Sequence, residues 1–138
     1  MNQTVSCAAG ALLDTWSSHS WTEGIQLETI EDMEKLVVRT ENSVYEITVI
    51  CGRTGDILVR GGRFFPEFTE ARLAGSSLGG SFLKLRGIYV GFNLEIHFDK
   101  RLIITSRVRQ ISVLLAQKAE IRAVTDRAYR AREKGRNP

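Results

Sequence analysis

The feature that most constrains the fold is a strict alternation of residue types from Ile88 to Phe98. The even positions carry large apolar side chains, which are Ile88, Val90, Phe92, Leu94, Ile96 and Phe98. The odd positions carry Tyr89, Gly91, Asn93, Glu95 and His97. Because successive side chains of a strand point to opposite faces, this pattern predicts one continuous strand with a single buried face.

Further segments with the same period of two are rich in β-branched residues and lie at 36–41, 44–51, 56–60 and 102–108. Short turns join them, at residues 52–55 and at Asp99-Lys100. The apolar phase flips across Gly87, which indicates a bend of the kind that curves a sheet. We therefore predict a mainly β fold of five or six antiparallel strands, a small barrel or strongly curved sheet of the SH3-like kind, with a C-terminal α-helix.

The chain divides into three predicted parts. Residues 1–33 form an N-terminal extension with a short helix at 8–16, residues 34–109 form the β-barrel domain, and residues 110–138 form a basic amphipathic helix. The apolar stripe of this helix consists of Ile111, Leu114, Ile121, Val124, Ala128 and Ala131. Its basic back consists of Arg122, Arg127, Arg130 and Lys134.

Charge is distributed unevenly along the chain, although the formal net charge is only +3. Residues 1–50 carry eight acidic and two basic residues, whereas residues 101–138 carry three acidic and ten basic residues. The basic C-terminal part, or tail, is therefore predicted to be attracted to phosphate groups, to acidic protein surfaces or to the acidic N-terminal part of a second copy.

Residues 62–81 lie between the predicted strands and are rich in glycine, serine and aromatic residues. We expect a connection that covers one mouth of the barrel with Phe64, Phe65, Phe68 and Leu73, and the alternative is a lid over a small-molecule site. The spacing of Gly75 and Gly80 matches a phosphate-binding P-loop, but Ser81 stands where that motif needs lysine. A backbone nest for an anion at Gly79, Gly80 and Ser81 stays open.

Catalytic, metal and cofactor sites are not predicted. Cys7 and Cys51 form no CxxC pair, the chain contains two histidines, and no GxSxG elbow accompanies its serines. No apolar run approaches the roughly 20 residues that cross a bilayer, and no basic leader precedes the apolar patch at the start. We expect a cytoplasmic protein that is not an enzyme and binds no metal, cofactor or membrane.

Two functions fit these features. The leading prediction is a non-enzymatic binding module for an anionic partner, with RNA or DNA favoured, because phosphate contacts give affinity with little sequence preference. The basic residues expected to make these contacts are Arg60, Arg63, Arg72, Lys84, Arg86, Arg122, Arg127, Arg130 and Lys134. The alternative is an assembly protein that forms a homo-oligomer or docks on a larger protein complex through its C-terminal helix. Trp16 and Trp21 would be its anchors, although packing over one end of the barrel is the simpler expectation for both.

Overall fold

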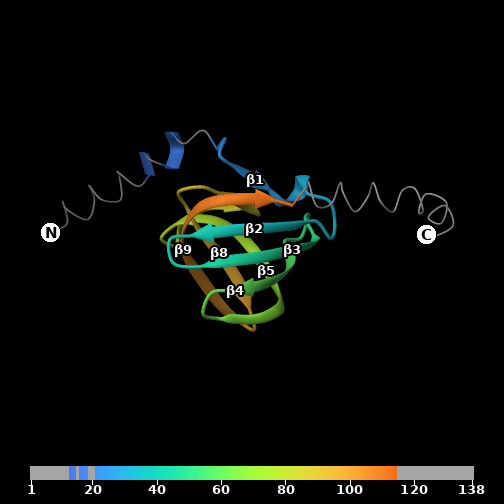
Figure 1. The fold of residues 1–138 in the computed structure, drawn as a ribbon. Coiled ribbons are helices and arrows are strands. Elements are labelled where there is room, and N and C mark those ends of the chain that lie inside the picture. Colours follow the sequence, from blue (N-terminus) through green and yellow to red (C-terminus); the bar gives the residue numbers. More distant parts are fainter. Residues whose placement is uncertain (1–12, 15, 19–20, 115–138) are drawn as a thin grey trace, which may run out of the picture.

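The structure is a computed structural model that describes residues 13–14, 16–18 and 21–114 (Figure 1). Its strands are β1 (Gly24–Gln26), β2 (Lys35–Thr40), β3 (Val44–Cys51), β4 (Asp56–Gly61), β5 (Phe65–Leu78), β6 (Ser81–Leu85), β7 (Gly87–Tyr89), β8 (Asn93–Phe98) and β9 (Arg101–Val113). A short 3-10 helix, Leu27–Thr29, follows β1. The prediction of a mainly β fold is confirmed. Within these residues, no helix has the length and hydropathy needed to cross a membrane.

Seven strands form one antiparallel sheet in the order β4-β3-β2-β9-β8-β5-β6. The meander β2-β3-β4 follows the predicted boundaries to within one residue. Leu36 lies opposite Ile47, and Ile47 lies opposite Val59. All three side chains are buried. The alternation in the sequence therefore located both the strands and their inward faces.

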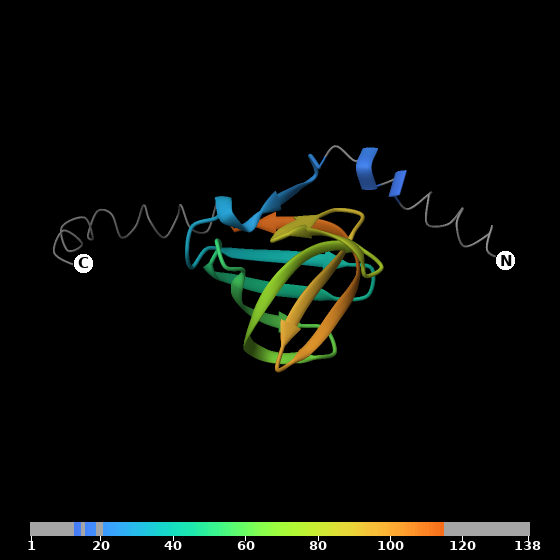
Figure 2. The same ribbon diagram turned by 180° about the vertical axis from the view of Figure 1, so that it is seen from behind.

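Two long strands turn this sheet into a ring of hydrogen bonds (Figure 2). β5 pairs with β4 along its first half and with β8 along its second half. It changes partner at Arg72, which lies opposite both Asp56 and His97. β9 similarly pairs with β8 up to Arg107 and with β2 from Val108 onward. The ring thus runs β4-β3-β2-β9-β8-β5 and returns to β4, while β6 pairs with the second half of β5.

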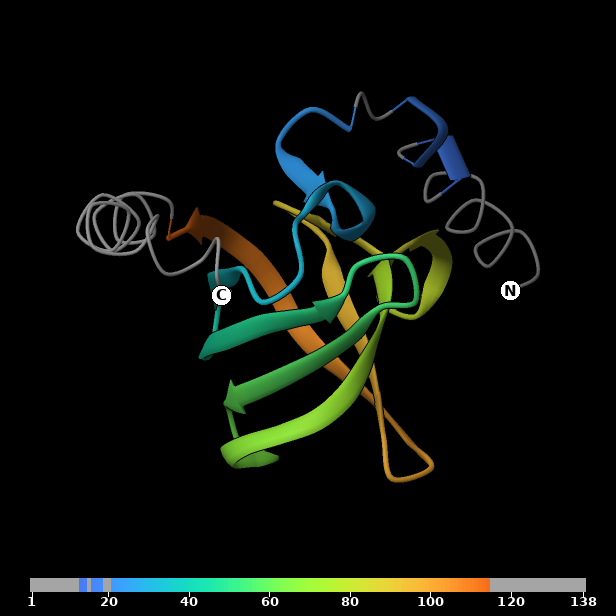
Figure 3. The same cartoon turned by 90° about the vertical axis from the view of Figure 1, so that its right-hand side faces the viewer.

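The hydrophobic core lies inside this ring. Its largest fully buried side chains are Phe65, Leu27, Leu36, Ile47, Ile57, Leu73, Ile88, Leu94 and Ile96. They come from β2, β3, β4, β5, β7, β8 and the 3-10 helix, so folding removes this apolar surface from water only when the ring closes. β1 pairs with β7 in a small separate sheet at one end of the ring (Figure 3).

The expectation of a covering loop at 62–81 is wrong, because most of this segment is strand β5. The residues opposite Ile57 and Val59 are Ala71 and Thr69, which are small or polar, so the segment lacks the apolar alternation of a strand. Phe65 and Leu73 belong to the core, whereas Phe64 and Phe68 are exposed. Backbone pairing to β4 and β8, rather than an aromatic plug, holds this segment in place.

The predicted continuous strand over residues 88–98 is also wrong. It is broken into β7 and β8 by a turn at residues 90–92, where Gly91 has a φ of +94°. The Val90 N–H donates to the Glu23 carbonyl, and the Gly91 N–H donates to the Val108 carbonyl. The alternation survives the turn because Ile88 and Leu94 both reach the main core. Phe92 instead joins a second cluster. The predicted bend before Gly87 is confirmed, since Arg86 has a φ of +56°.

The C-terminal helix was expected from residue 110, but β9 continues to Val113. Ile111 lies opposite Val38 and Val113 lies opposite Leu36, and both pack against the core. Tertiary pairing therefore overrides the helical composition of residues 110–113. Residues 115–138, including the predicted basic back of the helix, lie outside the described residues.

Gly75 offers a test of this packing, because β5 passes between β6 and β8 at that residue. A Cβ at Gly75 would lie 2.0 Å from the Lys84 carbonyl oxygen, and the φ of +149° disfavours a side chain. We expect Gly75→Ala to lower the free energy of unfolding by about 2 kcal/mol more than Gly79→Ala. The control Gly79 also has a positive φ but has nothing within 4 Å of its Cβ position. Urea denaturation measures both, and equal losses would contradict the close approach of β5 and β6.

Candidate functional site

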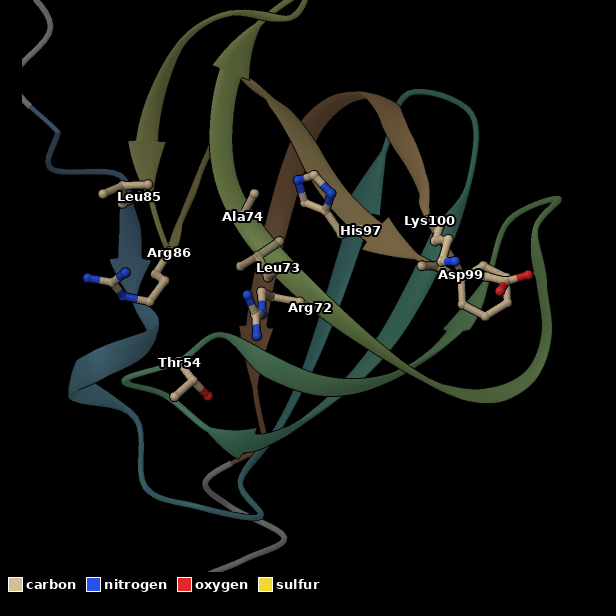
Figure 4. A pocket seen from close by; sticks show the side chains of 10 residues that line it. Thr54, Arg72, Leu73, Ala74, Leu85, Arg86, His97, Asp99 and Lys100 are labelled. Atoms are coloured by element: carbon tan, nitrogen blue, oxygen red, sulfur yellow. The ribbon is translucent and has the colours of Figure 1, made fainter.

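A pocket of about 500 Å³ opens where β5 changes partner (Figure 4). Its walls come from the β3–β4 turn, the middle of β5, the end of β6, the end of β8 and the β8–β9 turn. The residues that line it are Thr54, Arg72, Leu73, Ala74, Leu85, Arg86, His97, Phe98, Asp99 and Lys100. These five elements come from four separate stretches of the chain, at residues 54, 72–74, 85–86 and 97–100.

Backbone hydrogen bonds fix these walls relative to one another. The Leu73 N–H donates to the Gly55 carbonyl at 2.8 Å, which ties the β3–β4 turn to β5. The Arg86 N–H donates to the Ala74 carbonyl at 2.8 Å, which ties the end of β6 to the other side of β5. The pocket is thus shaped by the backbone and not only by side-chain packing.

Three cationic side chains line the pocket, from three different elements: Arg72 on β5, Arg86 after β6 and Lys100 in the β8–β9 turn. The Arg72 guanidinium lies 3.7 Å from Asp56, and that of Arg86 lies 3.6 Å from Glu28. These ion pairs are long and partly exposed to solvent, so they stabilise the fold little and leave both guanidinium groups able to bind another anion.

Two parts of the rim have left-handed backbone. Asp99 and Lys100 have φ values of +52° and +65°, as a two-residue hairpin turn favours. Arg86 also has a positive φ, and its buried Nε has no hydrogen-bond partner among the described residues. Both features of Arg86 cost free energy, and such costs are typical of residues held in place for binding.

The structure does not bring the other sequence-predicted basic residues to this pocket. Arg60 donates to Glu46 at 2.6 Å, and its guanidinium carbon lies 4.3 Å from the centre of the Phe68 ring. Arg63 is exposed in the β4–β5 turn. The Lys84 ammonium lies 5.2 Å from the centre of the Trp21 ring. Of the five predicted cations before the tail, the pocket contains Arg72 and Arg86.

The predicted anion nest lies in the β5–β6 turn, whose backbone donors bond within the chain. The Gly79 N–H donates to the Asn93 side-chain oxygen at 2.8 Å, and the Gly80 N–H donates to the Ser77 hydroxyl at 3.2 Å. Ser81 begins β6 and is exposed. The turn is therefore held by side chains of β5 and β8.

Trp16 and Trp21 pack against the chain's own aromatic residues. Trp21 stacks on Phe92 at 4.9 Å and meets Tyr89 edge-on at 5.0 Å, and Trp16 contacts Trp21 and Phe82. Burial raises the pKa of Tyr89, and the nearby Glu28 carboxylate raises it further. Helical backbone at Leu13, Asp14 and 16–18 leads into this cluster, while residues 8–12 and 15 of the predicted short helix lie outside the described residues.

The remaining chemical groups give no sign of a metal centre. In the part of the chain that the structure describes, no three His, Cys, Asp or Glu side chains are grouped to hold a metal ion.

Cys51 lies beside the β3–β4 turn, where a hydrogen bond from the Thr54 side chain lowers the pKa of its thiol.

Sequence reasoning missed Lys100 and Thr54 as site residues and treated both as turn residues. It also gave no reason to separate Arg72 from the other basic residues. The missing information was that residues 65–78 form a strand, because that strand places Arg72 opposite both Asp56 and His97. No local pattern supplied this information, because Thr69 and Ala71 stand where an alternating strand would carry large apolar residues.

The aromatic cluster generates a prediction about stability. We expect Trp21→Ala to lower the free energy of unfolding by about 3 kcal/mol, because it removes the stacked and edge-on contacts. The control Phe64→Ala removes an exposed ring and should cost about 0.5 kcal/mol or less. Urea denaturation followed by circular dichroism measures both. Similar losses for the two variants would show that the N-terminal segment is not packed on the ring.

The pocket lining combines two guanidinium groups and one ammonium group with one carboxylate, one hydroxyl, one imidazole and several apolar side chains. Comparison of the chain with protein-family models, with curated proteins and with solved structures finds no match.

Proposed function

We propose that this protein is a non-enzymatic binding module that holds an anionic partner in the pocket at the partner change of β5, with nucleic acid the favoured partner. The observation that carries the proposal is that Arg72, Arg86 and Lys100, from three different elements, all line one cavity. Asp99 is the only carboxylate among the lining residues. Guanidinium and ammonium groups bind phosphate oxygens through charge-assisted hydrogen bonds.

A small SH3-like barrel is the scaffold that we propose for this site. The ring of hydrogen-bonded strands supports this interpretation, since closure fixes the five segments of the pocket wall. The basic tail adds attraction at longer range, because residues 115–138 carry seven basic and three acidic residues.

Binding rather than catalysis is favoured by the contacts of the lining side chains. A hydroxyl nucleophile needs an adjacent base within hydrogen-bond reach. Instead, the Thr54 hydroxyl donates a hydrogen bond to the Asp56 carboxylate at 2.8 Å and not to the His97 imidazole. Thr54 thus holds the turn that shapes the pocket.

Fluorescence polarisation with labelled single-stranded RNA and DNA tests this function. We expect binding that weakens between about 50 and 200 mM salt. Arg72→Ala and Arg86→Ala should each weaken binding by about tenfold, the size of one lost charge-assisted contact. The control Arg60→Ala removes the same charge at a distant, paired site and should change affinity by less than about twofold. Absence of binding at about 50 mM salt, or an equal effect of Arg60→Ala, would contradict the proposal.

Self-association is a second candidate function, favoured by exposed apolar side chains on the outer face of β6-β5-β8-β9. Leu85, Gly75, Glu95 and Ile104 form one cross-strand row, and Leu85 and Ile104 are 56% and 42% exposed. Leu83 and Leu102 are exposed in the adjoining rows. Exposed apolar side chains that gather on one face are typical of protein contacts.

Sedimentation of the full chain tests the second candidate. If this face joins two copies, Leu85→Lys and Ile104→Lys should each shift the protein from dimer to monomer, because each buries a charge in the contact. Phe64→Lys places the same charge on an exposed position elsewhere and should leave the dimer intact. A wild-type chain that stays monomeric at high concentration would remove self-association.

A further inference from the structure

We infer that the outer face of β6-β5-β8-β9 binds the basic tail, residues 115–138, of a second copy of this chain, and that Glu95 of one copy pairs with Arg132 of the other. The inference rests on self-association, the second candidate function, and specifies what the face contacts. It follows from an unpaired carboxylate on this face, from the charge pattern of the tail and from the place where the described chain ends.

Glu95 carries a carboxylate that has no partner. Its neighbours in β8, Leu94 and Ile96, are buried in the core, so alternation along the strand directs Glu95 to the outer face. Only 8% of the residue is exposed, yet its carboxylate makes no hydrogen bond or ion pair with any other described residue. Within the described ranges, the fully covered side-chain polar atoms without a hydrogen bond are Gln26 Oε1 and Arg86 Nε, so the Glu95 carboxylate still touches solvent. It can therefore accept a hydrogen bond from a cation that a partner brings.

The row of residues that contains Glu95 combines this acceptor with exposed apolar side chains. Ile104 lies directly opposite Glu95 on β9, and Gly75 lies opposite it on β5. Because Gly75 has no side chain, the next one along the row is that of Leu85 on β6, two strand spacings or about 10 Å away. Leu85 and Ile104 are both exposed. One acceptor between two apolar side chains matches the guanidinium head and the aliphatic stem of an arginine.

A second copy of the same face is a poor partner for this row. A face-to-face dimer centred on it would bury the Glu95 carboxylates of both copies against Leu85 and Ile104. Removal of a charge from water is unfavourable unless a group of opposite charge pairs with it. A segment that carries a cation beside apolar side chains is therefore the better occupant.

The tail supplies such a cation. Residues 115–138 carry seven basic and three acidic residues. In the helix that the sequence predicts for this segment, which lies outside the described residues, Arg132 is about 20° around the axis from Ile121 and one turn after Ala128. Arg130 is about 180° from Ile121, on the basic back. Of the seven tail cations, Arg132 thus lies nearest in angle to Ile121 and to the apolar stripe.

The place where the described chain ends favours the tail of a second copy over the chain's own tail. The Leu114 N–H donates to the Lys35 carbonyl, so the tail begins beside β2. Glu95 lies opposite the first part of β9, at Ile104, and β9 bends over the ring before it pairs with β2 (Figure 1). A helix over residues 115–132 is straight and about 27 Å long, so it cannot follow this bend back to Glu95. The tail of a second copy approaches the face from outside and meets no such limit.

Sedimentation of the full chain measures the dissociation constant of the assembly. We expect Glu95→Gln and Arg132→Gln each to raise this constant at least about tenfold, because each removes one partner of a charge-assisted hydrogen bond. The controls Glu70→Gln, at an exposed position elsewhere on β5, and Arg130→Gln, on the basic back, should change it by less than about twofold. Arg132 follows the last strand of the ring in the sequence, so Arg132→Gln tests the pairing even if Glu95→Gln fails to fold.

Charge reversal tests whether the tail comes from a second copy. Glu95→Lys and Arg132→Glu should each abolish association, because each brings like charges together. An equimolar mixture of these two variants should associate again, since each copy then meets an opposite charge on the other. A mixture that stays monomeric would overturn the inference, because pairing within one copy cannot be restored by mixing.

Association of the wild-type chain that Glu95→Gln and Arg132→Gln leave unchanged would overturn the inference and leave self-association standing. A wild-type chain that stays monomeric at high concentration would overturn both the inference and the second candidate function. Neither result bears on the proposed anion site, because Glu95 does not line that pocket.

Discussion

The change of partner along β5 is the interaction on which the rest of the structure depends. Without it, β4 would be the open edge of a meander and the apolar faces of β2, β3 and β4 would lie against solvent. Pairing of residues 65–72 with β4 and of residues 72–77 with β8 joins the two ends of the sheet. Closure of the ring gives hydrogen-bond partners to the backbone N–H and C=O groups at the edge of β4, and it encloses the core in the same step.

The same change of partner places the functional groups. Arg72 lies opposite Asp56 on one side and His97 on the other, so the β3–β4 and β8–β9 turns approach the same point. Main-chain hydrogen bonds from Leu73 and Arg86 hold the neighbouring walls. Groups positioned in this way lose little conformational entropy on binding, which raises the affinity available to a few contacts.

Strands that bury one face and expose the other were predicted well from the sequence, and strands without that pattern were predicted poorly. The strands β2, β3 and β4 alternate because one face meets the core, and their boundaries were predicted closely. β5 escaped prediction because Thr69 and Ala71 occupy its core-side positions beside Val59 and Ile57. Such a strand is specified by its two neighbours rather than by its own composition.

The residues of the pocket could not be singled out from the sequence for the same reason. Charge and composition identified Arg86 as one of many basic residues, and nothing local distinguished it from Arg60, which pairs with Glu46 elsewhere on the ring. Lys100 was predicted correctly as a turn residue, but its place in the wall of the same pocket as Arg72 depends on a long-range pairing. Alternation over residues 88–98 likewise gave the buried positions without revealing the turn at Gly91.

The central claim is that the partner change of β5 creates the anion site, and backbone amide NMR tests it most directly. A ¹H–¹⁵N correlation spectrum of the full chain is recorded during titration with adenosine monophosphate. The account predicts saturable shifts at Thr54, Arg72, Ala74, Arg86 and Lys100, which are far apart in sequence and meet only at the pocket. Shifts confined to Arg60, Arg63 and the β5–β6 turn, with these five amides unchanged, would contradict it.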